Sequence, residues 1–171
     1  MAKVKRTQGR KRYAYYKELG GAPARAALSK TARVLLELQL IRGRVLDYGC
    51  GHGFDANNLG WDAFDPYYRP RLFRGPYDTI VVNHVINILT RDSRAKLYAQ
   101  VDALLTVGGA AYLSTSRNIP TIGKAGVRQR LQNYIVLTLA SVYADDEEEI
   151  YELKQGTAFE DRTLEFEVRV S

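Results

Sequence analysis

Short runs of apolar and β-branched residues recur along the chain, each followed by a polar or glycine-rich turn. They predict strands at residues 44–47, 61–65, 77–83 and 110–115. A further β-branched run covers residues 134–143, and residues 150–153 alternate like its antiparallel partner. The strictly alternating residues 164–170 predict an extra strand or a pairing edge.

Helical periodicity lies between several of these runs. Residues 22–40 carry apolar pairs three and four apart, with Pro23 suited to a first turn and Ser29 and Lys30 as a point of division. Gly43 is the expected C-cap. Residues 91–105 predict an amphipathic helix, and residues 53–60 leave room for barely two helical turns.

This alternation of strands and helices predicts an α/β fold with a mostly parallel sheet. The stretch between Asp65 and Asp78 is short, so a strand there is either absent or reduced to a few residues around 72–73. The acidic residues 145–149 separate two predicted strands and indicate a charged hairpin tip. We expect a flexible arm at residues 1–21 and one folded domain at residues 22–171.

Composition narrows the functional classes. The chain has 171 residues, a net charge of +6 and a single cysteine, Cys50, so no internal disulfide is possible and a reducing cytoplasm is expected. No apolar run is long enough to span a membrane. The excess charge gathers at the front, where a basic arm could bind a phosphate backbone or could be a solvated terminus: Lys3, Lys5, Arg6, Arg10, Lys11 and Arg12.

The most informative stretch runs from Asp47 to Gly53, where an acid at the end of a strand precedes glycine at every second position. Such a turn brings backbone close to a ligand, because no Cβ blocks the approach. A second acid, Asp65, ends the next strand 18 residues after Asp47. A ribose-binding carboxylate is expected about 20 residues on in nucleotide-binding α/β units. The other interpretation of the glycines is a tight turn without a ligand.

These residues resemble the class I S-adenosylmethionine (SAM) dependent methyltransferases. Three stretches, residues 47–53, 61–70 and 82–89, are similar to small bacterial and phage methyltransferases, among them a group associated with DNA phosphorothioation. The resemblance implies a single-domain Rossmann-like sheet, mostly parallel, with a C-terminal antiparallel hairpin and a reduced third-strand region. It also implies an enzyme with SAM as its methyl donor.

The resemblance also assigns roles to residues. Asp65 is expected to bind both ribose hydroxyls, and the backbone around Gly49, Gly51 and Gly53 to approach the amino-acid part of SAM. Asp47 is expected to orient that loop or to bond a water beside the ligand ammonium. Asp55 is either a partner of that ammonium or a first-turn acid that favours its helix.

The acceptor side is expected after the strand at residues 77–83, at Asn83 and His84. Asn83 is also expected to contact the cofactor. His84 is either a proton acceptor or a hydrogen-bonded structural histidine. Tyr67 or Tyr68 either packs on adenine or anchors its loop. His52, His84 and one cysteine make no convincing zinc set, so no metal is expected.

Nucleic acid is the preferred methyl acceptor, because cations recur in the loop after residue 115, at Arg117, Lys124 and Arg128. The alternatives are a protein or small-molecule acceptor, or a SAM-binding module without turnover. An NAD-binding domain is disfavoured, because the chain is too short for a second substrate domain. No exocyclic-amine DNA methyltransferase motif follows Asn83, and one cysteine disfavours covalent cytosine chemistry.

Overall fold

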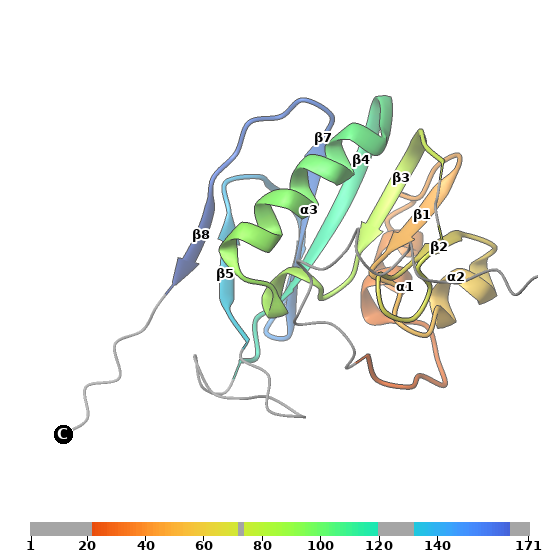
Figure 1. Cartoon of the computed structure of the whole chain (residues 1–171). Helices are drawn as coiled ribbons and strands as arrows, with labels where there is room; N and C mark the ends of the chain where they lie inside the picture. Colours follow the sequence, from red (N-terminus) through yellow and green to blue (C-terminus); the bar gives the residue numbers. More distant parts are fainter. Residues whose placement is uncertain (1–21, 72–73, 120–131, 165–171) are drawn as a thin grey trace, which may run out of the picture.

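The computed structural model describes residues 22–71, 74–119 and 132–164 (Figure 1). Its main feature is a six-stranded sheet with the spatial order β2 (Asp62–Phe64), β1 (Val45–Tyr48), β3 (Tyr77–Val82), β4 (Leu105–Ser116), β7 (Glu148–Lys154) and β6 (Ala140–Ala144). Strands β2, β1, β3 and β4 are parallel to one another, whereas β7 runs antiparallel to both β4 and β6. The expected Rossmann-like α/β sheet, mostly parallel with an antiparallel hairpin, is confirmed.

Helices cover both faces of this sheet. Helix α3 (Arg91–Leu104) packs Leu97 and Val101 into a core with Leu46, Ile80 and Leu113. Helix α1 (Lys30–Glu37) packs on the other face, against the alternate strand residues that include Val45, Val81 and Tyr112. Figure 1 shows α3 lying along β4 and β7 on one side of the sheet. In the part of the chain described, no helix is long and apolar enough to cross a membrane.

The beginning and end of α1 differ from the prediction. Residues 22–28 are not helical, and the helix begins after Ser29, whose side chain accepts a hydrogen bond from the Ala32 N–H. This cap satisfies one of the unpaired N–H groups at the helix start. The helix ends at Glu37 with Leu38 as its C-cap, and Gln39 follows in the left-handed conformation (φ 56°). Gly43 also has a φ of 56°, but it lies beyond the helix end and is not the C-cap that was expected.

The other helix predictions hold. Helix α2 (Phe54–Leu59) is the expected short helix after the glycine loop, with left-handed glycines, Gly53 and Gly60, at both ends. Helix α3 begins at the N-cap Thr90, whose hydroxyl accepts from the Ser93 N–H. A 3₁₀ turn, η1 (Ile86–Ile88), lies between β3 and α3.

The region of the third strand is reduced. Among residues 65–71 and 74–76, which the structure describes, there is only an isolated bridge between Asp65 and Arg69 and no strand beyond β2. Residues 72–73, where a reduced strand was an alternative, lie outside the described residues. In the described part of the sheet β2 is therefore an edge strand.

The C-terminal strands differ from the prediction in their pairing. Residues 134–143 form two strands instead of one, because β5 (Tyr134–Leu137) pairs with β8 (Asp161–Leu164) in a separate two-stranded sheet. Only β6 pairs with β7. The hairpin turn is shorter than the acidic run, since Glu148 and Glu149 already belong to β7. Of the predicted strand at 164–170, only Leu164 lies in β8, and the rest falls outside the described residues.

Candidate functional site

The glycine loop lies where the strand order reverses. Strands β2 and β3 pair with opposite sides of β1, and the chain enters the loop at the carboxyl end of β1. Ligands of open α/β sheets bind at such a switch point. Gly49, Gly51 and Gly53 all have positive φ, at 83°, 55° and 78°. A Cβ on Gly49 would lie 2.4 Å from Cγ2 of Val85, so glycine is required by both backbone and packing.

Four backbone N–H groups of this loop have hydrogen-bond partners within the protein. Those of Gly49 and Cys50 donate to the Phe64 carbonyl at 2.7 and 3.1 Å, and that of Gly53 donates to the Cys50 carbonyl at 2.8 Å. The Gly51 N–H donates to Oδ2 of Asp65 at 3.0 Å. A phosphate-binding loop offers its N–H groups to an anion, whereas this loop uses these four to fix its own shape.

Asp65, the expected ribose ligand, is buried and holds two loops together. Besides the Gly51 N–H, its carboxylate accepts from the Tyr67 and Tyr68 N–H groups, both at 2.8 Å. Arg69 closes the same turn, donating to the His52 carbonyl at 2.7 Å. The acid at the end of β2 is thus joined directly to the glycine loop.

Asp47 lies buried at the end of β1, with Asp55 and Asp65 close by. The pKa of Asp47 is raised to about 7, chiefly by burial and also by the charges of Asp55 and Asp65, while Arg25 and Arg69 oppose the shift. Asp55, in the first turn of α2, accepts from the Ser29 N–H at 2.9 Å and pairs with Arg25 at 3.4 Å. Three buried carboxylates therefore surround the glycine loop.

The side chains around the loop tips are aromatic and exposed to different degrees. The Tyr67 ring is 63% exposed and meets the Tyr68 ring edge-on at 4.8 Å, while Tyr68 also lies 4.3 Å from the His52 ring. Both roles expected for the tyrosines thus remain available to Tyr67. Burial raises the pKa of the Cys50 thiol to about 12, so this thiol stays protonated at neutral pH.

Asn83 follows β3 and lies between the expected cofactor side of the site and the expected acceptor side. With its amide nitrogen toward Thr31 Oγ1 (2.9 Å) and Ser114 Oγ (3.3 Å), its oxygen accepts from the Arg25 guanidinium at 3.1 and 3.3 Å. The same oxygen accepts from Ser29 Oγ at 3.1 Å. Arg25 thus lies between Asp55 on the cofactor side and Asn83 on the expected acceptor side.

His84 is the next residue and has a left-handed backbone conformation, φ 52°. For a residue that has a Cβ atom, this conformation is unfavourable in free energy. Residues held in it are found often at functional sites. Nε2 of the imidazole lies 2.9 Å from Oε2 of Glu148 and Nδ1 lies 3.1 Å from Oγ of Ser116. His84 is therefore hydrogen-bonded, as expected of a structural histidine. Its position at the carboxyl edge of the sheet is also compatible with a role as proton acceptor.

The cations expected to meet phosphates are only partly described. Arg117 pairs with Glu149, donates to the Ile135 carbonyl at 2.8 Å and lies 4.7 Å over the Tyr134 ring. Lys124, Arg128 and the arm at residues 1–21 lie outside the described residues. In the described segments, no group of three or more His, Cys, Asp or Glu side chains is arranged to hold a metal ion.

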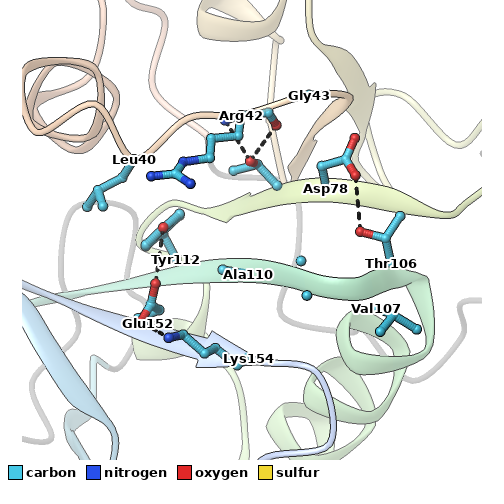
Figure 2. A pocket seen from close by; sticks show the side chains of 13 residues that line it. Leu40, Arg42, Gly43, Asp78, Thr106, Val107, Ala110, Tyr112, Glu152 and Lys154 are labelled. Atoms are coloured by element: carbon cyan, nitrogen blue, oxygen red, sulfur yellow. Dashed lines mark hydrogen bonds and ion pairs between the residues drawn. The ribbon is translucent and has the colours of Figure 1, made fainter.

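A pocket of about 410 Å³ lies at the opposite, amino-terminal edge of the parallel strands (Figure 2). Its polar side chains contact one another: Asp78 accepts from Thr106 Oγ1 at 3.1 Å, and Glu152 accepts from Tyr112 at 3.3 Å. Burial raises the pKa of Tyr112 to about 12. None of the residues expected to bind the cofactor lines this pocket, so it is separate from the candidate site.

Sequence reasoning missed four residues that the structure brings to this edge: Arg25, Thr31, Ser116 and Glu148. Arg25 lies upstream of the helix that the chain forms, and Ser116 follows a strand whose end was expected at residue 115. Glu148 was assigned to a charged tip, yet it is 1% exposed. One pattern could have found it, because extending the alternation of residues 150–153 backwards places Glu148 on the same face of β7 as Ile150.

No protein-family model matches the sequence, and no curated protein matches it at a significant level. Among solved structures, the chain is similar to the glycopeptide N-methyltransferase MtfA complexed with sinefungin, at 18% identity and a TM-score of 0.43, over 77% of this chain and 73% of that one. It is also similar to the PH0226 protein from Pyrococcus horikoshii OT3, at 12% identity and a TM-score of 0.47, over 72% of this chain and 86% of that one.

A third similarity is to an S-adenosylmethionine-dependent methyltransferase from Clostridium acetobutylicum ATCC 824. The identity is 15% and the TM-score 0.42, over 78% of this chain and 69% of that one. The identities and TM-scores of all three similarities are low, so the chemistry of the site has to be derived from the residues of this chain.

Proposed function

We propose that the chain is a class I SAM-dependent methyltransferase. The observation that carries this proposal is the chemistry around the glycine loop, which three buried carboxylates, Asp47, Asp55 and Asp65, surround. Such a site favours a cation. SAM has a sulfonium and an ammonium group that suit these carboxylates, whereas the pyrophosphate of NAD would be repelled by them.

The residues present fit the parts of SAM. Asp65 is held at the end of β2, where a ribose diol is expected, and the guanidinium of Arg25 is 30% exposed and can meet a ligand carboxylate. Asp47 can give up its proton to compensate a bound ammonium group. When bound, SAM supplies an activated methyl group for in-line transfer. The protein's part is to orient the acceptor and exclude water.

Calorimetry with SAM, its demethylated product and NAD tests this proposal. We expect binding of the first two, and a loss of roughly 1–3 kcal/mol in Asp65→Ala, the scale of lost hydrogen bonds to a charged acceptor. Because Asp65 also supports the loop, Asp65→Asn and the melting temperature are measured alongside. Asp62→Ala is the matched control, since Asp62 is exposed on the same strand. Binding of NAD without SAM, or unchanged affinity in Asp65→Ala, contradicts the proposal.

We infer further that the methyl acceptor is nucleic acid. The support is the cluster of six cations at residues 3–12 together with Lys124 and Arg128. Arg117 contributes less than the sequence suggested, because Glu149 offsets its charge. The narrower relationship, to phage and phosphorothioation-associated methyltransferases, is supported by the three similar sequence stretches.

Fluorescence anisotropy with labelled tRNA and duplex DNA at two salt concentrations tests the acceptor class. Removing residues 1–12 should weaken binding and flatten its salt dependence, because fewer phosphate contacts release fewer counterions. A full-length variant with the six cations of the arm changed to glutamine separates charge from length. SAM binding should survive in both variants.

Equal and negligible binding by all forms at low salt removes nucleic acid as the acceptor. Incubation with labelled SAM and separate pools of protein and metabolites then decides between the other acceptors. SAM binding without methyl transfer to any pool indicates a binding module.

A further inference from the structure

A carboxylate is buried at the edge of the sheet where the methyl acceptor is expected. It belongs to the acidic run 145–149, which the sequence predicted to be a charged hairpin tip. Glu148 is 1% exposed and pairs in register with Ser116 across β7 and β4. Because β7 is antiparallel to β4, its first residue lies beside the carboxyl end of β4 and near that of β3. Glu148 therefore reaches the edge that carries Asn83 and His84.

The partners of this carboxylate are specific. Its Oε2 accepts from Thr31 Oγ1 at 2.9 Å and contacts Nε2 of His84 at 2.9 Å. Its Oε1 is buried and has no hydrogen-bond partner in the part of the chain described. A buried carboxylate is costly unless it is paired, so one unsatisfied oxygen is unusual for a purely structural contact.

The hydrogen bonds define which nitrogen of His84 is basic. Glu148 can only accept at Nε2 while it is ionised, so Nε2 carries the hydrogen of the neutral imidazole. Nδ1 then has the free lone pair and accepts from the Ser116 hydroxyl at 3.1 Å. The backbone is fixed as well, because the His84 N–H donates to Ser114 Oγ at 3.0 Å. The imidazole is 33% exposed, so a substrate or solvent can reach it.

The other charges nearby are bound to one another. Lys30, on α1, pairs with Asp145 and Glu147 in the hairpin turn, and Tyr143 donates to Asp145. On the other side Arg117 pairs with Glu149, and Arg25 pairs with Asp55. Among the described residues, Glu148 is the carboxylate within ion-pair distance of His84.

We propose that Glu148, His84 and Ser116 form a proton relay for methyl transfer, and that the acceptor is consequently an N–H or O–H group. This inference rests on the proposed function. The acceptor lone pair forms a bond to the methyl carbon while the carbon–sulfur bond breaks, and that bond's electron pair goes to sulfur, giving a neutral thioether. The acceptor's proton passes to Nδ1 of His84, directly or through the Ser116 hydroxyl, and then to solvent.

His84 is the catalytic residue in this arrangement, and Glu148 is a positioning residue that acts through it. The carboxylate fixes the Nε2–H tautomer and stabilises the imidazolium after proton transfer. A carboxylate acceptor has no proton to lose and needs no such relay. An amine or amide of a base, or a sugar hydroxyl, does need one, and nucleic acids carry both kinds of group.

Nitrogen NMR of ¹⁵N-histidine-labelled protein tests the relay without an acceptor. The chain has two histidines, so the exposed His52 is an internal control. We expect the Nε2–H tautomer for neutral His84 in the wild type and a mixture of tautomers in Glu148→Gln, because an amide can donate to Nε2 as well as accept from it. Glu147→Gln, which changes an exposed neighbour, should leave His84 unmoved.

Turnover gives the second readout, with labelled SAM and pools of tRNA and duplex DNA. Glu148→Gln should lower kcat without changing SAM affinity, because the tautomer of His84 is no longer fixed. His84→Asn should lower kcat by about 10²-fold or more, with SAM affinity unchanged in calorimetry. Asparagine is chosen because it tolerates the left-handed backbone of position 84. Ser116→Ala should slow transfer less, because the acceptor can still reach Nδ1.

The outcomes separate the two proposals. Absence of SAM binding in the wild type contradicts the proposed function. Three results, each obtained with SAM binding intact, contradict the relay alone. They are an Nδ1–H tautomer of His84, a tautomer unchanged in Glu148→Gln, and label recovered as a base-labile methyl ester.

Discussion

The carboxyl group of Asp47 should make the protein less stable as the pH rises. Its pKa is raised from 3.8 to about 7, chiefly by burial, so the folded state retains a proton that the unfolded chain loses. Between these values the native state binds more protons, and stability falls as the pH increases. A shift of about three units corresponds to about 4 kcal/mol at neutral pH, at about 1.36 kcal/mol per unit.

Asp47→Asn removes this ionisation, while it changes the size of the side chain little. Relative to the wild type, we expect a free energy of unfolding higher by up to about 4 kcal/mol at pH 8 and little gain near pH 4, where the carboxyl is protonated in both states. Urea unfolding measured at pH 4.5, 6, 7 and 8 on both proteins gives this difference at each pH.

Subtracting the two stability profiles removes the contribution of every other titrating group. Asp146→Asn, an exposed acid in the hairpin turn, is the control and should give a flat difference. A difference between Asp47→Asn and the wild type that is equally flat across this range would refute the assignment of a raised pKa to Asp47.

Two further predictions concern backbone and core. Gly49→Ala should lower the free energy of unfolding, measured with heat or urea, by about 2–5 kcal/mol, because position 49 has a positive φ and the new Cβ would lie 2.4 Å from a packed side chain. Gly60→Ala should lower it by only about 1–2 kcal/mol, because position 60 also has a positive φ but lies in open space. Arg94→Ala should cost about 3–5 kcal/mol, because its buried guanidinium binds Asp161; Arg162→Ala, in an exposed pair, should change stability by less than about 1. Similar costs within either pair of variants would contradict this reasoning.

The strands and the glycine loop could be predicted because their causes are local. Alternating apolar residues and a strand-ending acid depend on a few consecutive positions, and the positive φ angles of Gly49, Gly51 and Gly53 follow from the same short segment. The parallel arrangement of β1 to β4 follows from the helices or loops between them. The mostly parallel sheet was therefore accessible from sequence.

Pairing partners were less accessible. Residues 134–143 look uniform in sequence, yet they form two strands with different partners. The chain bends between β5 and β6, so β5 pairs with β8, which comes later in the sequence, and β6 pairs with β7. The start of α1 was missed for a related reason. Apolar spacing continues upstream of Ser29, but that side chain caps the helix and so decides where it begins.

The two halves of the candidate site differ in the same way. The cofactor half rests on one loop and the acid that follows it, so its residues lie close in sequence. The relay combines one residue from the end of β3, one from the end of β4 and one from the start of β7. Only the reversed direction of β7 brings Glu148 to that edge, and an acidic run in a hairpin gives no local indication of burial. Thr31 and Arg25 then connect the halves, since Thr31 contacts Glu148 and Arg25 contacts both Asp55 and Asn83. A catalytic arrangement built across three strands is therefore visible only once their order and directions are known.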